Sequence, residues 1–237
     1  MDQITMIGIL VSLILGICSF VASNNYIVGI AVLALGVLYF LLLARPMFKK
    51  YKAKVMRFHE CYHFINTFIV SLSVKGTIQA AYESAISSMP DEFLVNIENI
   101  ETFTNKEKIE HLGKYFRFHI YSLFLDLLNL FEDQGGDILQ MSGYLLDELR
   151  SIEEYVDTSS SISRKKLTEF AILWFLTLVI MVFLRFALAQ FFSLIEKQIF
   201  YPIGIGAVCL FCYITIHIGL MRMCSLEIKG WNDHEKI

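Results

Sequence analysis

The stretch ITMIGILVSLILGICSFVA, residues 4–22, is followed after Ser23-Asn24-Asn25 by YIVGIAVLALGVLYFLLLA, residues 26–44. Each run holds 19 residues without a charge, and about 20 helical residues cross the hydrocarbon core of a bilayer. The short polar link predicts a transmembrane hairpin over residues 1–44. A cleavable signal peptide is the alternative for the first run. It requires a positively charged leader, however, and Asp2 is the only charge before the run.

Two further apolar runs occupy residues 170–194 and 199–221, and Glu196-Lys197-Gln198 joins them. They predict a second transmembrane hairpin, assigned to residues 167–225, with a short tail at 226–237. The composition agrees, with 56% hydrophobic residues and a mean hydropathy of +0.56. Only 18% of the residues are charged, against about 25% in ordinary globular domains. We therefore expect an integral membrane protein with four spans.

Lysine and arginine concentrate where the predicted spans meet the segment 45–166. Because basic residues near span ends favour the cytoplasmic side, this segment and both termini are predicted to be cytoplasmic. The same residues suit anionic lipid headgroups. Arg185, inside the third run, is expected to snorkel to the far interface, to meet Glu196, or to contact the transmembrane helix of a partner. The membrane-junction residues are Arg45, Lys49, Lys50, Lys52, Lys54, Arg57, Arg164, Lys165 and Lys166.

Apolar residues in the segment 45–166 recur at steps of three and four, which is typical of amphipathic helices in a bundle. The first helix is predicted to continue from the second span with a kink at Pro46, and to end near Gly76. A second helix follows, then a short one through Leu94, Ile97 and Ile100. A loop over 102–108 precedes one long helix over 109–130 and another over 138–156. No stretch alternates with period two, so this domain is predicted to be an antiparallel helical bundle and the whole chain all-α.

Two glycine turns interrupt the bundle pattern, at Gly76-Thr77 and at Gly135-Gly136-Asp137. In each, glycine can adopt the left-handed conformation and the polar residue can cap the next helix. Gly76 and Gly136 lie 60 residues apart (136 − 76). This spacing suggests an internal repeat of two helical hairpins, although glycine followed by a cap is also the ordinary form of a tight helical turn.

The segment 58–163 is strongly acidic, with six Lys and Arg residues against 17 Asp and Glu, a net charge of 6 − 17 = −11. An acidic surface repels nucleic acid and the anionic membrane surface, and favours a basic protein partner. A surface that serves only solubility is the alternative.

The sequence His59-Glu60-Cys61-Tyr62-His63 matches the His-Glu-x-x-His pattern of zinc proteases. On a helix its histidines share one face and can bind zinc while the glutamate activates water. Glu83 lies 20 residues further on (83 − 63), where some such enzymes supply a third ligand. Only residues 45–58 separate the motif from the second span, which leaves no room for the substrate-binding sheet of these enzymes. A membrane zinc protease is therefore the alternative function rather than the preferred one.

Two segments and the topology resemble a known family. Residues 64–85, with Ser73-Val74-Lys75-Gly76-Thr77-Ile78, and residues 131–150, with Gln134-Gly135-Gly136-Asp137-Ile138-Leu139, resemble the two hairpins of type II secretion system F domains. Two spans, one helical domain and two more spans are similar to the Tad-type (tight adherence) platform proteins. The resemblance covers about residues 45–225, and residues 90–114 fit it poorly.

The resemblance implies an inner-membrane platform protein of a pilus or secretion machine. Such a protein has no catalytic site and needs no cofactor. It is expected to form oligomers and to couple a cytoplasmic hexameric ATPase to extraction of pilin subunits, with a paralogous platform protein as a further partner. A helical membrane scaffold or sensor unrelated to pili is a third possibility.

Overall fold

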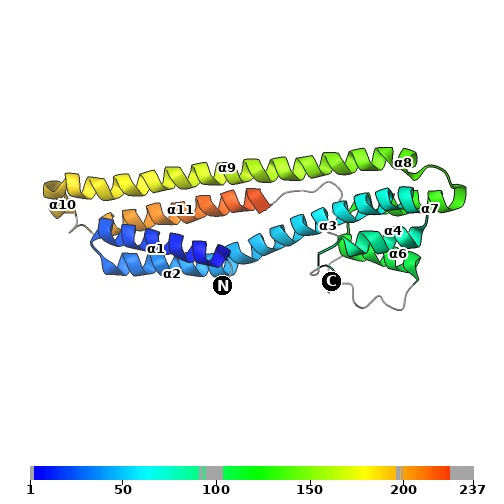
Figure 1. Ribbon diagram of the computed structural model, residues 1–237. Coiled ribbons are helices and arrows are strands. Elements are labelled where there is room, and N and C mark those ends of the chain that lie inside the picture. Colours follow the sequence, from blue (N-terminus) through cyan, green and yellow to red (C-terminus); the bar gives the residue numbers. More distant parts are fainter. Residues whose placement is uncertain (1–2, 91–92, 94–103, 196–197, 199, 225–237) are drawn as a thin grey trace. The chain divides into compact units, whose positions relative to one another are not determined.

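The computed structural model describes residues 3–90, 93, 104–195, 198 and 200–224. Every regular element in these residues is a helix, which confirms the predicted all-α class (Figure 1). Four helical segments are long and apolar enough to cross a membrane: Thr5–Ser23, Tyr26–Lys75, Gly143–Ala187 and Phe200–Cys224. The predicted tail 226–237, the Glu196-Lys197 link and the short helix through Leu94, Ile97 and Ile100 lie outside the described residues.

The described residues divide into two compact units. Unit 1 takes those within 3–51 and 160–224, and unit 2 takes those within 52–159. Both boundaries fall inside helices, namely α3 (Arg45–Lys75) and α9 (Gly143–Ala187). The domain limits predicted from charge and hydropathy are 44/45 and 166/167. Both helices are continuous across the boundary between the units.

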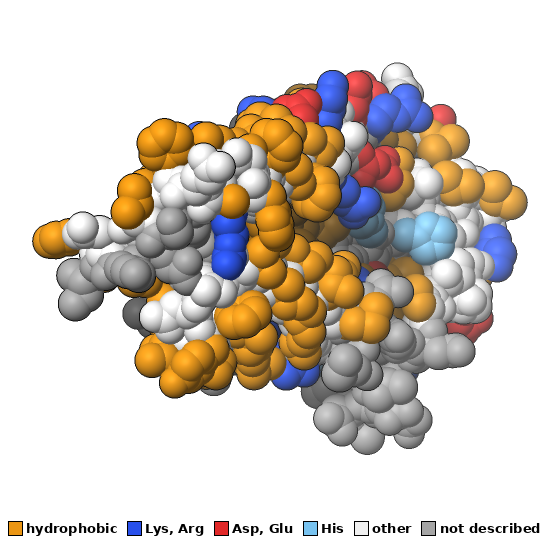
Figure 2. Space-filling view, turned by 90° about the vertical axis from the view of Figure 1, so that its left-hand side faces the viewer, with side chains coloured by type: hydrophobic (Ala, Val, Ile, Leu, Met, Phe, Trp, Pro, Cys, Tyr) orange, Lys and Arg blue, Asp and Glu red, His pale blue; other side chains and the backbone are white. Residues whose placement is uncertain are grey.

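Unit 1 is built on the hairpin of α1 (Gln3–Ser23) and α2 (Tyr26–Tyr39), followed by a π-helical turn at Phe40–Ala44 and the start of α3. Asn25 caps α2 by accepting a hydrogen bond of 2.9 Å from the Ile27 backbone N–H. The last part of α9, α10 (Ala189–Ile195) and α11 (Phe200–Cys224) complete the unit. Seen from the end at which α10 lies, the surface is mainly hydrophobic (Figure 2), as expected for helices that face lipid.

Small residues let α1 and α2 approach closely, and the sequence analysis missed them. On α1, Ser12 and Ser19 are fully buried and recur with Gly8, Gly16 and Ser23 at steps of three and four. A Cβ at Gly16 would lie 2.9 Å from the Leu33 Cβ, and one at Gly29 would lie 2.8 Å from the Phe20 Cβ. Such spacing of small residues is the usual signature of close helix packing in membranes. A tightly packed face on the first helix could therefore have been predicted from residues 8–23.

Unit 2 contains the rest of α3 with α4 (Ile78–Ser87), α6 (Asn105–Phe116), α7 (His119–Gln134), α8 (Ile138–Met141) and the start of α9. Its core is aromatic, and Phe64 of α3 lies at its centre with no exposed surface. The centroid of the Phe64 ring lies 5.9–6.4 Å from those of Phe68, Tyr82, Phe116, Tyr121 and Phe124. These rings join α3 to α4, α6 and α7.

The long helix predicted over 109–130 is in fact two helices, so that prediction was wrong. Arg117 takes a left-handed conformation (φ 53°) and ends α6, and Phe118 then turns into the core at 3% exposure. Burial of Phe118 against Phe58, with ring centroids 5.4 Å apart, offsets the cost of placing a non-glycine residue in that region. No glycine or proline marks this break in the sequence.

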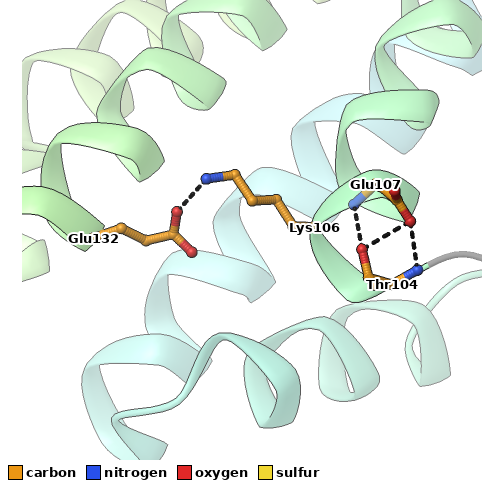
Figure 3. A network of polar contacts seen from close by, with 4 residues as sticks. All are labelled: Thr104, Lys106, Glu107 and Glu132. Atoms are coloured by element: carbon orange, nitrogen blue, oxygen red, sulfur yellow. Dashed lines mark hydrogen bonds and ion pairs between the residues drawn. The ribbon is translucent and has the colours of Figure 1, made fainter.

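The loop predicted over 102–108 also ends earlier than expected, because α6 already begins at Asn105. Thr104 and Glu107 form a capping box: the Glu107 carboxylate accepts from the Thr104 backbone N–H at 2.8 Å, and Thr104 Oγ1 accepts from the Glu107 N–H at 3.4 Å (Figure 3). The Thr-x-x-Glu pattern is a known helix start signal. A loop is nevertheless predicted here from the sequence, because most residues of this stretch are polar.

Candidate functional site

The two glycine turns lie at the same end of unit 2. Phe58 of α3 contacts Phe118, the N-cap residue of α7, and Phe68 contacts Phe124 further along both helices, with ring centroids 5.4 Å and 5.2 Å apart. The two helices therefore run parallel, and both end at a turn, α3 at Gly76 and α7 at Gly135. We call this end of unit 2 the turn pole, made of residues 70–80 and 130–144.

Backbone conformation explains the residues of the first turn. Gly76 has φ +70°, and its N–H donates to the Leu72 carbonyl at 2.9 Å. Thr77 then caps α4, because its Oγ1 accepts from the Ala80 N–H at 3.4 Å. No atom lies within 4 Å of a Cβ built at Gly76. The glycine is therefore needed for its positive φ and not for space.

The second turn has the same construction with one more glycine. Gly135 and Gly136 have φ +67° and +117°, and the Gly135 N–H donates to the Phe131 carbonyl at 2.8 Å. Asp137 caps α8, since its Oδ1 accepts from the Leu139 N–H at 2.9 Å. The helix predicted over 138–156 is interrupted after Met141, and α9 starts at Gly143. The structure thus brings Gly76, Thr77, Gly135, Gly136 and Asp137 to one pole.

The turn pole exposes both acidic and apolar side chains. Val74 is 80% exposed, and Leu130 and Leu139 are 42% and 46% exposed. Asp133 and Asp137 are also exposed. The Lys106 ammonium group of α6 forms a salt bridge with the Glu132 carboxylate of α7 (Figure 3). A surface of this kind, apolar patches among acids, is suited to binding a partner that is basic and partly apolar.

The residues of the His-Glu-x-x-His pattern contact three different partners. The His59 Nε2 lies 3.7 Å from the Asp157 carboxylate on α9, and the His63 Nε2 lies 3.3 Å from the Ser88 carbonyl. The Glu60 carboxylate accepts a hydrogen bond from the Tyr115 hydroxyl. Glu83 is exposed on α4, where Gln79 donates to it at 3.1 Å. In the part of the chain that the structure describes, no group of three or more His, Cys, Asp or Glu could hold a metal.

A buried carboxylate joins α3 to α6, and sequence reasoning did not find it. Glu60 is 5% exposed, and the Tyr115 hydroxyl donates to its Oε2 at 2.9 Å. The Arg57 guanidinium lies 5.3 Å from the centroid of the Tyr115 ring. Burial, followed by the hydrogen bond to Glu60, raises the pKa of Tyr115 to about 12. Tyr115 therefore remains a donor at any physiological pH.

We expect Tyr115→Phe to destabilise unit 2 by about 1–3 kcal/mol, because it removes a donor from a buried carboxylate. The adjacent Cys61 is fully buried and burial raises the pKa of its thiol, so alkylation of Cys61 reports opening of the unit. Tyr144→Phe, on a side chain that is 76% exposed, is the matched control. Equal Cys61 alkylation in the two variants would show that the Glu60 contact contributes nothing.

The membrane-junction residues divide between the two units. Arg45, Lys49, Lys50, Arg164, Lys165 and Lys166 belong to unit 1, while Lys52, Lys54 and Arg57 belong to unit 2. Arg185 lies near the last turn of α9 and is half-buried. Comparison with known proteins adds no assignment: no protein-family model, no curated protein and no solved structure matches the chain.

Proposed function

We propose that the chain is an inner-membrane platform protein of a Tad-type pilus or type II secretion-like machine. In this role unit 1 spans the membrane four times, and unit 2 and both termini lie in the cytoplasm. Unit 2 binds a hexameric secretion ATPase and passes its movement to unit 1. Unit 1 acts on pilin subunits in the bilayer together with a paralogous platform protein and further copies of the chain. The chain itself catalyses no reaction.

The observation that carries the proposal is the continuity of α3 and α9. α3 has 31 residues and α9 has 45, and each belongs to both units. A continuous helix bends with difficulty when its hydrogen bonds are intact. A force applied to unit 2 therefore reaches the apolar helices through two separate connections.

Charge supports the identity of the partner. The net charge of −11 over residues 58–163 favours a basic surface on the partner and speeds association with it. The turn pole adds exposed apolar side chains such as Val74, which supply binding energy that charge alone does not. The resemblance of the glycine turns to those of secretion F domains points the same way.

Co-purification of the full chain with the hexameric secretion ATPase of the same cell tests the proposal. Asp133→Lys with Asp147→Lys, at exposed positions near the turn pole, is expected to weaken binding at least tenfold, because two repulsive charges replace two attractive ones. Asp126→Lys with Glu154→Lys makes the same change in net charge at exposed positions outside the pole, about one turn before residue 130 and almost three turns after residue 144, and should weaken binding less.

Three outcomes would contradict the platform assignment. The first is no binding of the ATPase by the unmodified chain. The second is stoichiometric zinc in the purified protein that is lost on His59→Ala, which would favour the protease instead. A reporter fused within residues 105–134 and found outside the cytoplasm would overturn the topology on which the role depends.

A further inference from the structure

Positive charge in unit 1 is concentrated at one end. The described residues of this unit include eight Lys and Arg but a single acid, Glu169. Seven of the eight cations lie where α3 begins, where α9 enters the apolar stretch and where α11 ends. They are Arg45, Lys49, Lys50, Arg164, Lys165, Lys166 and Arg222.

Three helices that are distant in sequence meet at this end. Ala44, Leu220 and Met223 form a buried cluster, and Phe48 of α3 and Leu167 of α9 pack against it. We call these five residues the junction floor. Tyr51 of α3 is half-buried and lies three residues after Phe48, so the two side chains lie on the same face of the helix. The structure thus joins the two basic segments that the sequence separates by more than 100 residues.

Helix geometry distinguishes the cations that border the junction floor from those that do not. With about 100° per residue, Arg164 lies about 60° from Leu167 around α9, whereas Lys165 lies about 160° away. On α3, Arg45 follows the buried Ala44 and is itself half-buried, whereas Lys50 is exposed. Arg45 and Arg164 therefore border the junction floor, and Lys50 and Lys165 do not.

Apolar surface continues from the junction along the helices. Phe170 and Leu173 of α9 are 53% and 60% exposed, and Leu42, before the start of α3, is 65% exposed. A ligand that fits both features carries a negative charge at one end and a long apolar chain at the other. A nucleic acid or an acidic peptide would match the positive charge but not the apolar surface beside it.

We propose that the junction of α3, α9 and α11 binds an anionic phospholipid, with its phosphate held by Arg45, Arg164 and the Tyr51 hydroxyl and an acyl chain along α9. The proposal depends on the membrane location of unit 1, and not on the ATPase or the pilus. Bound lipid links the first residues of α3 to α9, the two helices that continue into unit 2. It therefore stabilises the segment through which force would pass.

Native mass spectrometry of the full chain, purified from nanodiscs of phosphatidylcholine with or without phosphatidylglycerol, tests the proposal. The unmodified chain should retain phosphatidylglycerol through detergent exchange. Arg45→Gln with Arg164→Gln should lower the retained fraction about 30-fold, since each cation near an anionic headgroup contributes about fivefold in affinity. Glycerol phosphate, which has the headgroup without the chains, should not displace the lipid.

Lys50→Gln with Lys165→Gln is the matched control, since it removes the same charge from the same two helices at neighbouring positions. Retention in this variant should stay within about threefold of the unmodified chain. Equal losses in the two variants would show that diffuse surface charge attracts the lipid, and would overturn the site. Displacement by glycerol phosphate, or no retention by the unmodified chain, would overturn it as well.

Discussion

Replacing Gly36 with leucine is expected to disrupt the packing of unit 1, whereas the same change at Gly204 should be tolerated. A Cβ at Gly36 would lie 2.7 Å from the Ser12 Oγ and 2.9 Å from the Ser12 Cβ, and it would also meet the Tyr213 hydroxyl. Ser12 is fully buried, and the Tyr213 hydroxyl donates to the Val32 carbonyl at 3.2 Å. The new side chain would therefore separate α1, α2 and α11 at once.

The expected cost of Gly36→Leu is about 3 kcal/mol or more, since overpacking and a broken buried hydrogen bond add together. Thermal unfolding of the full chain in detergent, followed with a thiol-reactive dye, measures it, because Cys209 and Cys212 are fully buried in the core of unit 1. No atom lies within 4 Å of a Cβ at Gly204 on α11. Equal midpoints for the two variants would contradict the close approach of α1 and α2.

Phe64→Ala is the second change with a large expected effect, and it acts on unit 2. Phe64 has no exposed surface and contacts rings from α3, α4, α6 and α7. Truncation of a buried phenylalanine to alanine costs about 3–5 kcal/mol, because it loses transfer free energy and leaves a cavity. The change therefore loosens several helices and not one contact.

Alkylation of Cys61, identified by mass spectrometry of its peptide, separates this effect from changes in unit 1, where the other four cysteines lie. We expect the rate to rise by about two orders of magnitude or more in Phe64→Ala. Tyr144→Ala, which truncates a side chain that is 76% exposed, should leave the rate almost unchanged. A rate for Phe64→Ala that matches the control would show that the aromatic cluster is not the core of unit 2.

Local signals account for the parts of the candidate site that the sequence predicted. Gly76, Gly135 and Gly136 have positive φ, which glycine adopts without strain, and Thr77 and Asp137 cap the helices that follow. Each of these features depends on a few neighbouring residues, so each was readable before any fold was known. The break at Arg117 was not, because it depends on the place that Phe118 finds beside Phe58 on another helix.

The His-Glu-x-x-His motif is readable from the sequence, but the contacts of its side chains are not. The spacing of His59, Glu60 and His63 is a property of the sequence, but the direction of each side chain depends on what packs around α3. In the structure Glu60 is buried against Tyr115, a residue 55 positions away (115 − 60), and His59 faces Asp157. Neither partner has any signature in the motif itself.

The sequence by itself determined the helical class, four apolar segments and the two glycine turns, because hydropathy, periodicity and backbone preference act over a few residues. Only the tertiary structure decided that the turns share one pole, which helix packs against the small residues of α1, and that Phe48 of α3 and Leu167 of α9 pack against one cluster. These depend on which helices pack together. Packing is a sum of many weak contacts between residues far apart in the chain. Patterns over a few neighbouring residues therefore do not predict which helices contact one another.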